Sequence, residues 1–294
     1  MKTDGVDRRK LTAREVSARK GGEKLVMLAA YDVATARATE RAGIDLILVG
    51  DSLGMVVLGY ETTVPVTVDD IVHHCRAVVR GAPRTHVVAD LPFLSYHLSD
   101  AQALENAGRL MQQGGADSVK LEGGRTVAGR IRALVDAGIP VMGHLGLTPQ
   151  RVGVIGGFRV QGRDRTMARQ IVEDAEMVAS AGAYALVLEL VPTELARIVS
   201  ERVPIPTIGI GAGPECDGQV LVAADLLGLD DRPPYRFVKR YAEVGAAMTD
   251  AFTRYAADVR GGAFPTGAQS YPMNLEEVTA LRDELDESRS EPVP

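Results

Sequence analysis

The stretch ALENAGRLMQQGGADSVKLEGG, residues 103–124, contains the structural unit that decides the fold. Leu104, Ala107 and Met111 are spaced so that they share one face of a helix. Gly115 stands where this helix is expected to end, because glycine adopts a left-handed turn without side-chain strain. The apolar run Ser118 to Leu121 then has the character of a buried strand. A helix, a glycine stop and a strand therefore follow one another within this stretch.

The same unit recurs along the chain. Gly43, Gly138 and Gly182 also follow helical patterns and stand shortly before another apolar run. Continuous apolar runs fit parallel strands that are buried on both faces. Eight strands are expected, at Leu25 to Ala29, Leu46 to Val49, His86 to Ala89, Ser118 to Leu121, Pro140 to Met142, Ala185 to Leu188, Pro206 to Ile210 and Val220 to Ala223. This alternation predicts an α/β fold, and a closed (β/α)8 barrel is favoured over an open doubly wound sheet.

The length of 294 residues is compatible with one barrel domain. We predict an N-terminal extension over residues 1–20, a barrel catalytic domain over 21–265, and a C-terminal helix with a polar tail over 266–294. Asn274 is the expected cap of this last helix. Two long connections, residues 52–84 and 145–170, are expected at the catalytic end of the barrel.

The composition argues against several classes of protein. With a formal net charge of −6 and 4% aromatic residues, nucleic acid is not an expected partner. No apolar run approaches the ~20 residues that span a bilayer, and no secretion signal begins the chain, so we expect a cytoplasmic protein without membrane partners. Cys75 and Cys216 lack CxxC spacing, which disfavours a disulfide framework or a zinc site.

Polar side chains gather where the predicted strands end, which is where barrel enzymes carry their functional groups. These residues are Asp51, Ser52, Asp90, Lys120, Glu122, His144 and Glu189. Any one of the acids alone would more simply be a helix cap or a loop hydrogen-bonding residue. Four carboxylates desolvated together, however, need a neutralising cation. Because an all-oxygen ligand set is typical of Mg²⁺, the pattern predicts a magnesium site at this end of the barrel.

Lys120 lies two residues before Glu122, so both side chains share one face of a strand and point inward or toward the barrel mouth. An inward lysine suits a substrate carboxylate or developing enolate charge. His144 remains open between a functional residue and a hydrogen-bonded rim residue. A structural role is favoured for the other histidines, His73, His74, His86 and His97.

Other motifs carry less information. The stretch GIGAG, residues 209–213, could cradle a phosphate or simply permit close backbone packing at the barrel mouth. The chain has no GxSxG nucleophile motif, and Cys216 has no evident paired base. Covalent acyl chemistry is therefore disfavoured.

Taken together, these segments resemble the ketopantoate hydroxymethyltransferase family. The resemblance is collinear over about residues 20–265 and includes LVGDSLGM from Leu48, VKLEGG from Val119, GHLGLTPQ from Gly143 and IGIGAG from Ile208. It implies a (β/α)8 TIM barrel of the phosphoenolpyruvate/pyruvate type. It also implies magnesium ligation by Asp51 and Asp90, with Glu122 completing the metal environment, and Glu189 as the catalytic proton acceptor. The implied 2-oxo acid contacts are Asp51, Ser52, Asp90 and Lys120.

The resemblance further implies a reaction of pantothenate biosynthesis. A hydroxymethyl group would pass from 5,10-methylenetetrahydrofolate to 3-methyl-2-oxobutanoate, forming 2-dehydropantoate and tetrahydrofolate through a magnesium-stabilised enolate. One Mg²⁺ per subunit is the implied cofactor, and the folate is a co-substrate to which no residue is assigned. A homo-oligomer, commonly a decamer, is the implied assembly.

The chain departs from the family pattern at two positions, and two alternative functions remain. Ala224 and Gln269 stand where the family commonly has histidine, which puts local loop contacts or subunit packing in doubt. A lyase or mutase of the same barrel class would use the same metal chemistry, although the chain lacks the KKCGH-type run of isocitrate-lyase-like enzymes. A non-catalytic barrel that binds oxo acids or serves as an assembly scaffold is disfavoured, because a binding protein would not require Glu189 as a base.

Overall fold

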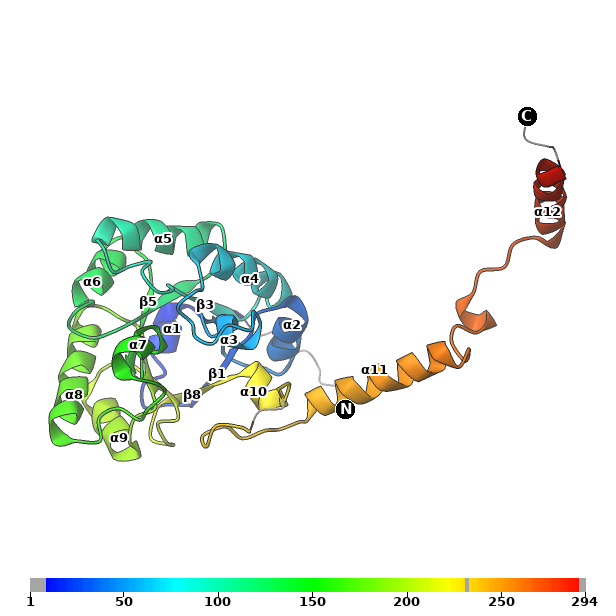
Figure 1. The fold of residues 1–294 in the computed structure, drawn as a ribbon. Helices are drawn as coiled ribbons and strands as arrows, with labels where there is room; N and C mark the ends of the chain where they lie inside the picture. Colours follow the sequence, from blue (N-terminus) through cyan, green and yellow to red (C-terminus); the bar gives the residue numbers. More distant parts are fainter. Residues whose placement is uncertain (1–8, 231–232, 291–294) are drawn as a thin grey trace. The chain divides into compact units, whose positions relative to one another are not determined.

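The computed structural model of the protein describes residues 9–230 and 233–290 (Figure 1). The chain divides into two compact units, Met1–Ala242 and Glu243–Pro294. The second unit contains α11 (Val244–Arg260), η2 (Gly267–Gln269) and α12 (Leu275–Ser290). Asn274 accepts a hydrogen bond from the amide of Glu276 at 2.9 Å, as expected of the cap. The predicted domain boundaries at residues 20 and 265 stay predictions, and the outermost parts of the predicted extension and tail, 1–8 and 291–294, lie outside the described residues.

Eight parallel strands close into a barrel in chain order, from β1 beside β2 to β8 beside β1. The strands are β1 (Leu25–Ala29), β2 (Leu46–Val49), β3 (His86–Asp90), β4 (Ser118–Glu122), β5 (Val141–Gly146), β6 (Ala185–Glu189), β7 (Thr207–Ile210) and β8 (Gly218–Val222). The predicted (β/α)8 barrel is therefore confirmed. Most strand residues are fully buried, as expected for a parallel sheet that is covered on both faces.

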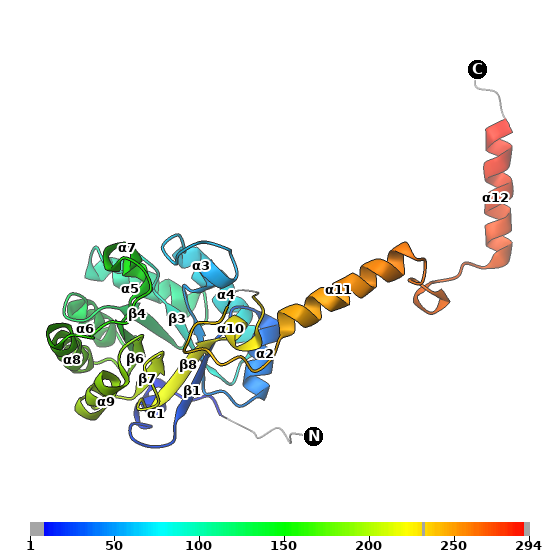
Figure 2. The same cartoon turned by 60° about the horizontal axis from the view of Figure 1, so that its bottom comes forward.

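Helices surround the barrel and decorate its two ends (Figures 1 and 2). Figure 2 shows α3 and α7 at one end of the barrel and α1 at the opposite end. Both α3 and α7 belong to the two long connections that were expected at the catalytic end. The helices of this unit are α1 (Ala13–Ser17), α2 (Val33–Arg41), α3 (Leu53–Val56), α4 (Val68–Gly81), α5 (Asp100–Gln112), α6 (Ala128–Asp136), η1 (Pro149–Arg151), α7 (Val152–Ile155), α8 (Arg165–Ser180), α9 (Thr193–Arg202) and α10 (Ala223–Leu227).

The glycine stops have the backbone conformation that the sequence predicts. Gly43, Gly115, Gly138 and Gly182 have φ angles of 76°, 80°, 84° and 101° and follow α2, α5, α6 and α8. A side chain at Gly182 would also lie only 2.9 Å from Val135. These glycines therefore let each helix end and the chain turn directly into the next strand.

Two predicted strand positions were wrong. The fifth strand spans Val141–Gly146 rather than Pro140 to Met142, because the polar residue His144 lies inside it and faces the barrel interior. The eighth strand spans Gly218–Val222 rather than Val220 to Ala223. Its start, Gly218, lies so close to the Leu25 backbone that a side chain would stand 2.6 Å from the Leu25 carbonyl oxygen. This close approach comes from strand pairing and gives no apolar signal in the sequence.

Three aspartates tie neighbouring strands together at the end of the barrel opposite the strand carboxyl ends. Asp45, Asp117 and Asp217 each stand directly before a strand, namely β2, β4 and β8. Each carboxylate accepts a hydrogen bond from a backbone amide at the start of the adjoining strand; the donors are Val26 at 2.9 Å, Val87 at 2.9 Å and Thr207 at 2.8 Å. These bonds satisfy amide groups at the strand starts and fix the register locally.

The N-terminal segment packs on this same end of the barrel. Val16 of α1 is completely buried and belongs to the hydrophobic core. Lys10 forms an ion pair with Asp117 at 2.8 Å, and Lys20 forms one with Asp217 at 2.9 Å. In the part of the chain that the structure describes, no helix is long and apolar enough to cross a membrane.

Candidate active site

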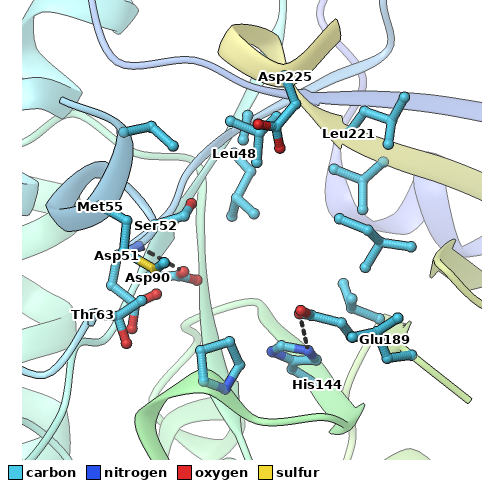
Figure 3. Close-up of a pocket in the computed structure, with 18 of the residues that line it drawn as sticks. Leu48, Asp51, Ser52, Met55, Thr63, Asp90, His144, Glu189, Leu221 and Asp225 are labelled. Atoms are coloured by element: carbon cyan, nitrogen blue, oxygen red, sulfur yellow. Dashed lines mark hydrogen bonds and ion pairs between the residues drawn. The ribbon is translucent and has the colours of Figure 1, made fainter. Parts of the chain in front are cut away.

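A pocket lies at the carboxyl ends of the strands and brings together all seven side chains that the sequence singled out there (Figure 3). Strands β3, β4, β5 and β6 supply Asp90, Lys120, Glu122, His144 and Glu189. Asp51 and Ser52 come from the turn after β2. Figure 3 shows Asp51 and Asp90 on one side of the pocket and His144 with Glu189 on the other.

Asp51 and Asp90 form one buried carboxylate pair. The Asp51 amide donates to Asp90 Oδ2 at 3.1 Å, and both residues are at most 3% exposed. Burial raises the pKa of Asp51, and the neighbouring charges of Asp90 and Glu122 raise it further. Burial also raises the pKa of Asp90, whereas Lys120 works in the opposite direction. The pair is thus stable in its ionised form only when cations compensate it.

Lys120 supplies one of these cations. Its Nζ lies 2.9 Å from Asp90 Oδ1, and the side chain is 4% exposed. Burial alone would lower the pKa of Lys120, but Asp90, Glu122 and Asp51 together outweigh it and raise this pKa. The inward position predicted for Lys120 is confirmed, and its ammonium group is fixed at the floor of the pocket.

His144 links two carboxylates across the pocket. Its Nδ1 lies 3.4 Å from Glu122 Oε1, and its Nε2 lies 3.2 Å from Glu189 Oε2 (Figure 3). Burial and Lys120 lower the pKa of His144, yet hydrogen bonding to Glu122 and Glu189 raises it overall to about 9. Lys120 Nζ also lies 3.3 Å from Nδ1, so the ring is held between Lys120, Glu122 and Glu189 and its Nε2 contact orients Glu189. Of the two open interpretations of His144, the geometry favours the functional one.

Gln150 is a site residue that the sequence analysis missed. Its Nε2 donates to Asp51 Oδ2 at 2.8 Å, and its backbone amide donates to Glu122 Oε2 at 3.2 Å. The buried Tyr96 hydroxyl donates to Gln150 Oε1 at 2.9 Å and accepts from the Glu122 amide. Gln150 thereby holds two of the carboxylates in place. The available signal was its position at the end of the motif GHLGLTPQ. An uncharged polar residue at that position does not by itself indicate a functional site.

Two hydroxyl groups near Asp51 were also missed. Tyr31 lies with its hydroxyl 2.7 Å from Ser52 Oγ. Thr63 lines the pocket and is 1% exposed, and its Oγ1 has no hydrogen-bond partner among the described residues. Figure 3 shows Thr63 beside Asp51. A buried hydroxyl without a partner costs about 1–3 kcal/mol, so this group is suited to meet an oxygen atom of a ligand.

Apart from Asp225, the remaining wall of the pocket is mostly apolar. Its apolar residues include Ala29, Leu48, Val187, Leu190, Ile210, Val220 and Leu221, together with Met55, Phe158, Tyr235 and Phe237. A small ligand with a charged end and a branched aliphatic end matches this division of the pocket, because each end would meet surroundings of its own kind.

The site has a chemical composition that suits a magnesium ion. Three nearly fully buried carboxylates, Asp51, Asp90 and Glu122, lie close to Lys120 and to His144, which also contacts Glu189. Across residues 9–230 and 233–290, however, no three His, Cys, Asp or Glu side chains are grouped closely enough to hold a metal as they stand. Mg²⁺ needs only one or two protein carboxylates and takes its other ligands from water or substrate. Asp51 and Asp90, which lie against each other, fit that requirement, and Glu122 is held nearby by Gln150 and His144.

The other motif residues lie where structural roles account for them. His86 binds Ser118 Oγ at 2.9 Å at the closed end of the barrel, and His74 binds the carbonyl oxygen of Tyr31 at 2.7 Å. His73, His74, His86 and His97 are absent from the pocket lining. Close packing accounts for the GIGAG stretch, since a side chain at Gly211 would lie 2.8 Å from Leu190. Cys75 and Cys216 are buried free thiols.

The fold and the pocket define the class of protein: a parallel (β/α)8 barrel enzyme whose charged mouth acts on a small molecule. More particularly, the chain belongs to the ketopantoate hydroxymethyltransferase family, whose family model matches residues 10–267. It is therefore a transferase of that family. This confirms the resemblance that the sequence motifs indicated.

Curated relatives cover nearly the same length. The chain is 57% identical over 250 residues to the 3-methyl-2-oxobutanoate hydroxymethyltransferase of Moorella thermoacetica, covering 85% of this chain and 93% of that relative. It is 54% identical over 258 residues to the enzyme of the same name from Heliobacterium modesticaldum, covering 88% and 94%.

Solved structures of lower identity share the fold. A 2,3-dimethylmalate lyase of the PEP mutase/isocitrate lyase superfamily matches with a TM-score of 0.56 and 16% identity, covering 95% of this chain and 98% of that one. A phosphoenolpyruvate phosphomutase from Streptomyces platensis subsp. rosaceus matches with a TM-score of 0.56 and 17% identity over the same shares. These similarities place the barrel in the expected structural type and say nothing about the reaction.

Proposed function

We propose that this enzyme transfers a hydroxymethyl group from 5,10-methylenetetrahydrofolate to 3-methyl-2-oxobutanoate, forming 2-dehydropantoate and tetrahydrofolate in pantothenate biosynthesis. The observation that carries the proposal is the convergence of Asp51, Asp90, Lys120, His144 and Glu189 around one small pocket. The names of the relatives at 52–57% identity support the choice of acceptor. We further propose a cytoplasmic homo-oligomer, which rests on the family resemblance.

The acceptor matches the two-sided lining of the pocket. Its carboxylate and 2-oxo oxygens would lie toward Lys120, Ser52 and the unpartnered hydroxyl of Thr63. Its branched aliphatic end would meet the apolar wall around Leu48 and Val187. In this orientation the C3 carbon would lie between the charged and apolar parts of the pocket, which Glu189 also lines.

Magnesium fits the proposed chemistry. Asp51 and Asp90 would hold the ion with Glu122 completing its environment, and when bound it would act as a Lewis acid that makes the C3 proton easier to remove. Gln150 keeps Asp51 and Glu122 in position through its 2.8 Å and 3.2 Å hydrogen bonds. Lys120 balances negative charge that develops on the 2-oxo oxygen.

Glu189 is the proposed proton acceptor. The C3–H bond breaks, the proton passes to the Glu189 carboxylate, and the electron pair left on the substrate forms the C–C bond to the methylene carbon as one of the two folate C–N bonds breaks. The oxygen of a water molecule then replaces the second folate nitrogen on that carbon, which becomes hydroxymethyl. The two freed nitrogens take up two protons, one equivalent to the proton held by Glu189 and one from the water, so that tetrahydrofolate leaves. His144 holds Glu189 through the 3.2 Å contact between Nε2 and Oε2. A fixed carboxylate within reach of the proton is what general-base catalysis requires.

A product assay tests the proposal. The purified chain is incubated with 3-methyl-2-oxobutanoate, 5,10-methylenetetrahydrofolate and Mg²⁺, and the products are identified by NMR. We expect 2-dehydropantoate and tetrahydrofolate in equal amounts, no product after chelation of the metal, and no product from Asp90→Ala. Cleavage products without folate consumption would instead identify a lyase of the same barrel type. Binding of the oxo acid without any product would support the non-catalytic alternative.

A further inference from the structure

The segment from residue 151 to residue 169, RVGVIGGFRVQGRDRTMAR, is rich in arginine and includes Phe158, which lines the pocket. It contains Arg151, Arg159, Arg163, Arg165 and Arg169 but only one acidic residue, Asp164, in a chain whose net charge is −6. All five arginines are exposed. Such a local excess of positive charge attracts anions from solution.

These arginines are not committed to neighbouring acids. No ion pair between the described residues involves any of the five guanidinium groups, although other surface arginines such as Arg125 and Arg202 have acidic partners. Asp164 is already used as the cap of α8, where it accepts from the amides of Thr166 and Met167. The proposed reaction gives none of the five arginines a role. Their positive charge is thus available to a ligand.

The basic segment is joined directly to the reaction site. Phe158 lines the pocket, and Arg159 follows it in sequence. The Gln161 amide donates to the Leu190 carbonyl oxygen at 2.8 Å, immediately after Glu189. Gly162 is buried against Leu195 and Ile171, which leave no room for a side chain there. The chain is therefore fixed at the pocket rim, with arginines on both sides of the fixed point.

We propose that residues 151–169 bind the carboxylate-rich glutamyl tail of the one-carbon donor, while its ring system enters the pocket. The proposal rests on the proposed function, because it takes a reduced folate as the donor. Reduced folates carry an uncharged ring system at one end and one or more γ-linked glutamates at the other. That distribution matches a pocket rim with Phe158 beside a series of unpaired arginines.

The spacing of the arginines suits a tail of several glutamates. Arg159 and Arg163 are four residues apart, so at most ~14 Å of extended chain separates their Cα atoms. Arg165 and Arg169 are also four residues apart and share one face of α8. Arginine is well suited to this task, because its planar guanidinium group can bind a carboxylate through two hydrogen bonds.

The test compares donors with one and three glutamates in steady-state kinetics. For the unaltered chain we expect a KM for the triglutamate donor several-fold below that for the monoglutamate, with the difference shrinking as salt is added. The double variant Arg159→Gln/Arg163→Gln should raise the KM for the triglutamate donor by roughly five- to tenfold. Its kcat at saturating donor and its KM for the oxo acid should stay unchanged.

A matched control removes the same charge elsewhere. Arg37 and Arg41 of α2 are also exposed and four residues apart, and Arg37→Gln/Arg41→Gln should leave the preference for the triglutamate intact. Equal KM values for the two donors, an unchanged preference in the Arg159/Arg163 variant, or an equal loss in the control would each overturn the tail-binding proposal while leaving the proposed function standing. No turnover with either donor would overturn both.

Discussion

Glu189 differs from Asp51, Asp90 and Glu122 in its access to solvent. Its side chain is 15% exposed, compared with 3% for Asp90 and 2% for Glu122. The buried acids are held by Lys120, Gln150 and His144, whereas Glu189 has one described side-chain partner, His144. A proton acceptor must reach the substrate and later release its proton to water, so this partial exposure suits Glu189 better than the other three acids.

Replacing Glu189 by glutamine should separate binding from catalysis. The amide keeps the size of the side chain but cannot accept the C3 proton. We expect the affinity for 3-methyl-2-oxobutanoate to change by less than about threefold, while kcat falls by about 10²–10⁴-fold. Calorimetric titration and steady-state kinetics measure the two quantities. Glu194→Gln on α9 is the control that should behave like the unaltered enzyme, and kcat within tenfold of normal for Glu189→Gln would remove Glu189 from its role.

His144 is expected to act through Glu189 rather than on the substrate. Replacement of His144 by glutamine shortens the reach toward Glu189, so we predict that kcat falls by about 10- to 100-fold while the KM for the oxo acid changes much less. The split between kcat and KM distinguishes orientation of the base from loss of the pocket. A KM for the oxo acid that rises as much as kcat falls would show that His144 instead holds the substrate or the pocket together.

At the scale of elements, an aspartate directly before a strand recurs three times and ties that strand to its neighbour. Asp217 accepts from the Gly21 amide, the Thr207 amide and hydroxyl, and Lys20. Partial burial raises the pKa of Asp217, but these hydrogen bonds outweigh it and hold the pKa below its usual value. The aspartate therefore joins the N-terminal segment, β7 and β8.

The variant Asp217→Asn should destabilise the barrel by roughly 2–3 kcal/mol at neutral pH, because an amide presents a donor where Lys20 and Thr207 also donate. A lowered pKa in the folded state means that the stabilisation is present above the ordinary aspartate value of about 4 and is lost as the pH falls through the lowered value. Thermal unfolding at pH 7 and near pH 3 measures the difference. A gap between variant and unaltered chain that widens in acid would contradict this account.

Local signals were sufficient to predict most strands and helix ends. Gly43 and Gly182 could be read as helix stops because a left-handed residue after a helix is a property of the chain itself. The start of β8 could not be predicted, because Gly218 is required by contact with Leu25, which is far away in sequence. Lys120 and Glu122 were placed correctly because alternation along a strand fixes which side chains share a face.

At the scale of the whole molecule, barrel closure explains why the site could be predicted in outline. Once parallel strands close, every strand end reaches the same mouth, so Asp51, Asp90 and Glu189 had to converge. The hydrogen bonds that set the site could not be predicted in the same way. Gln150 binds Asp51 across 99 positions of sequence, and no local pattern encodes that contact. The separation of Glu243–Pro294 as its own unit likewise depends on tertiary contacts, which the hydrophobic periodicity of the sequence does not predict.

The central claim is that this pocket removes the C3 proton of 3-methyl-2-oxobutanoate. The most direct measurement incubates the purified enzyme with this acid and Mg²⁺ in heavy water, without methylenetetrahydrofolate, and follows the C3 proton signal by NMR. We predict that the signal disappears, and that a chelator or the Glu189→Gln substitution preserves it. If the enzyme binds the acid but the C3 proton persists both without and with added tetrahydrofolate, the assignment of this pocket as a site of proton removal is wrong.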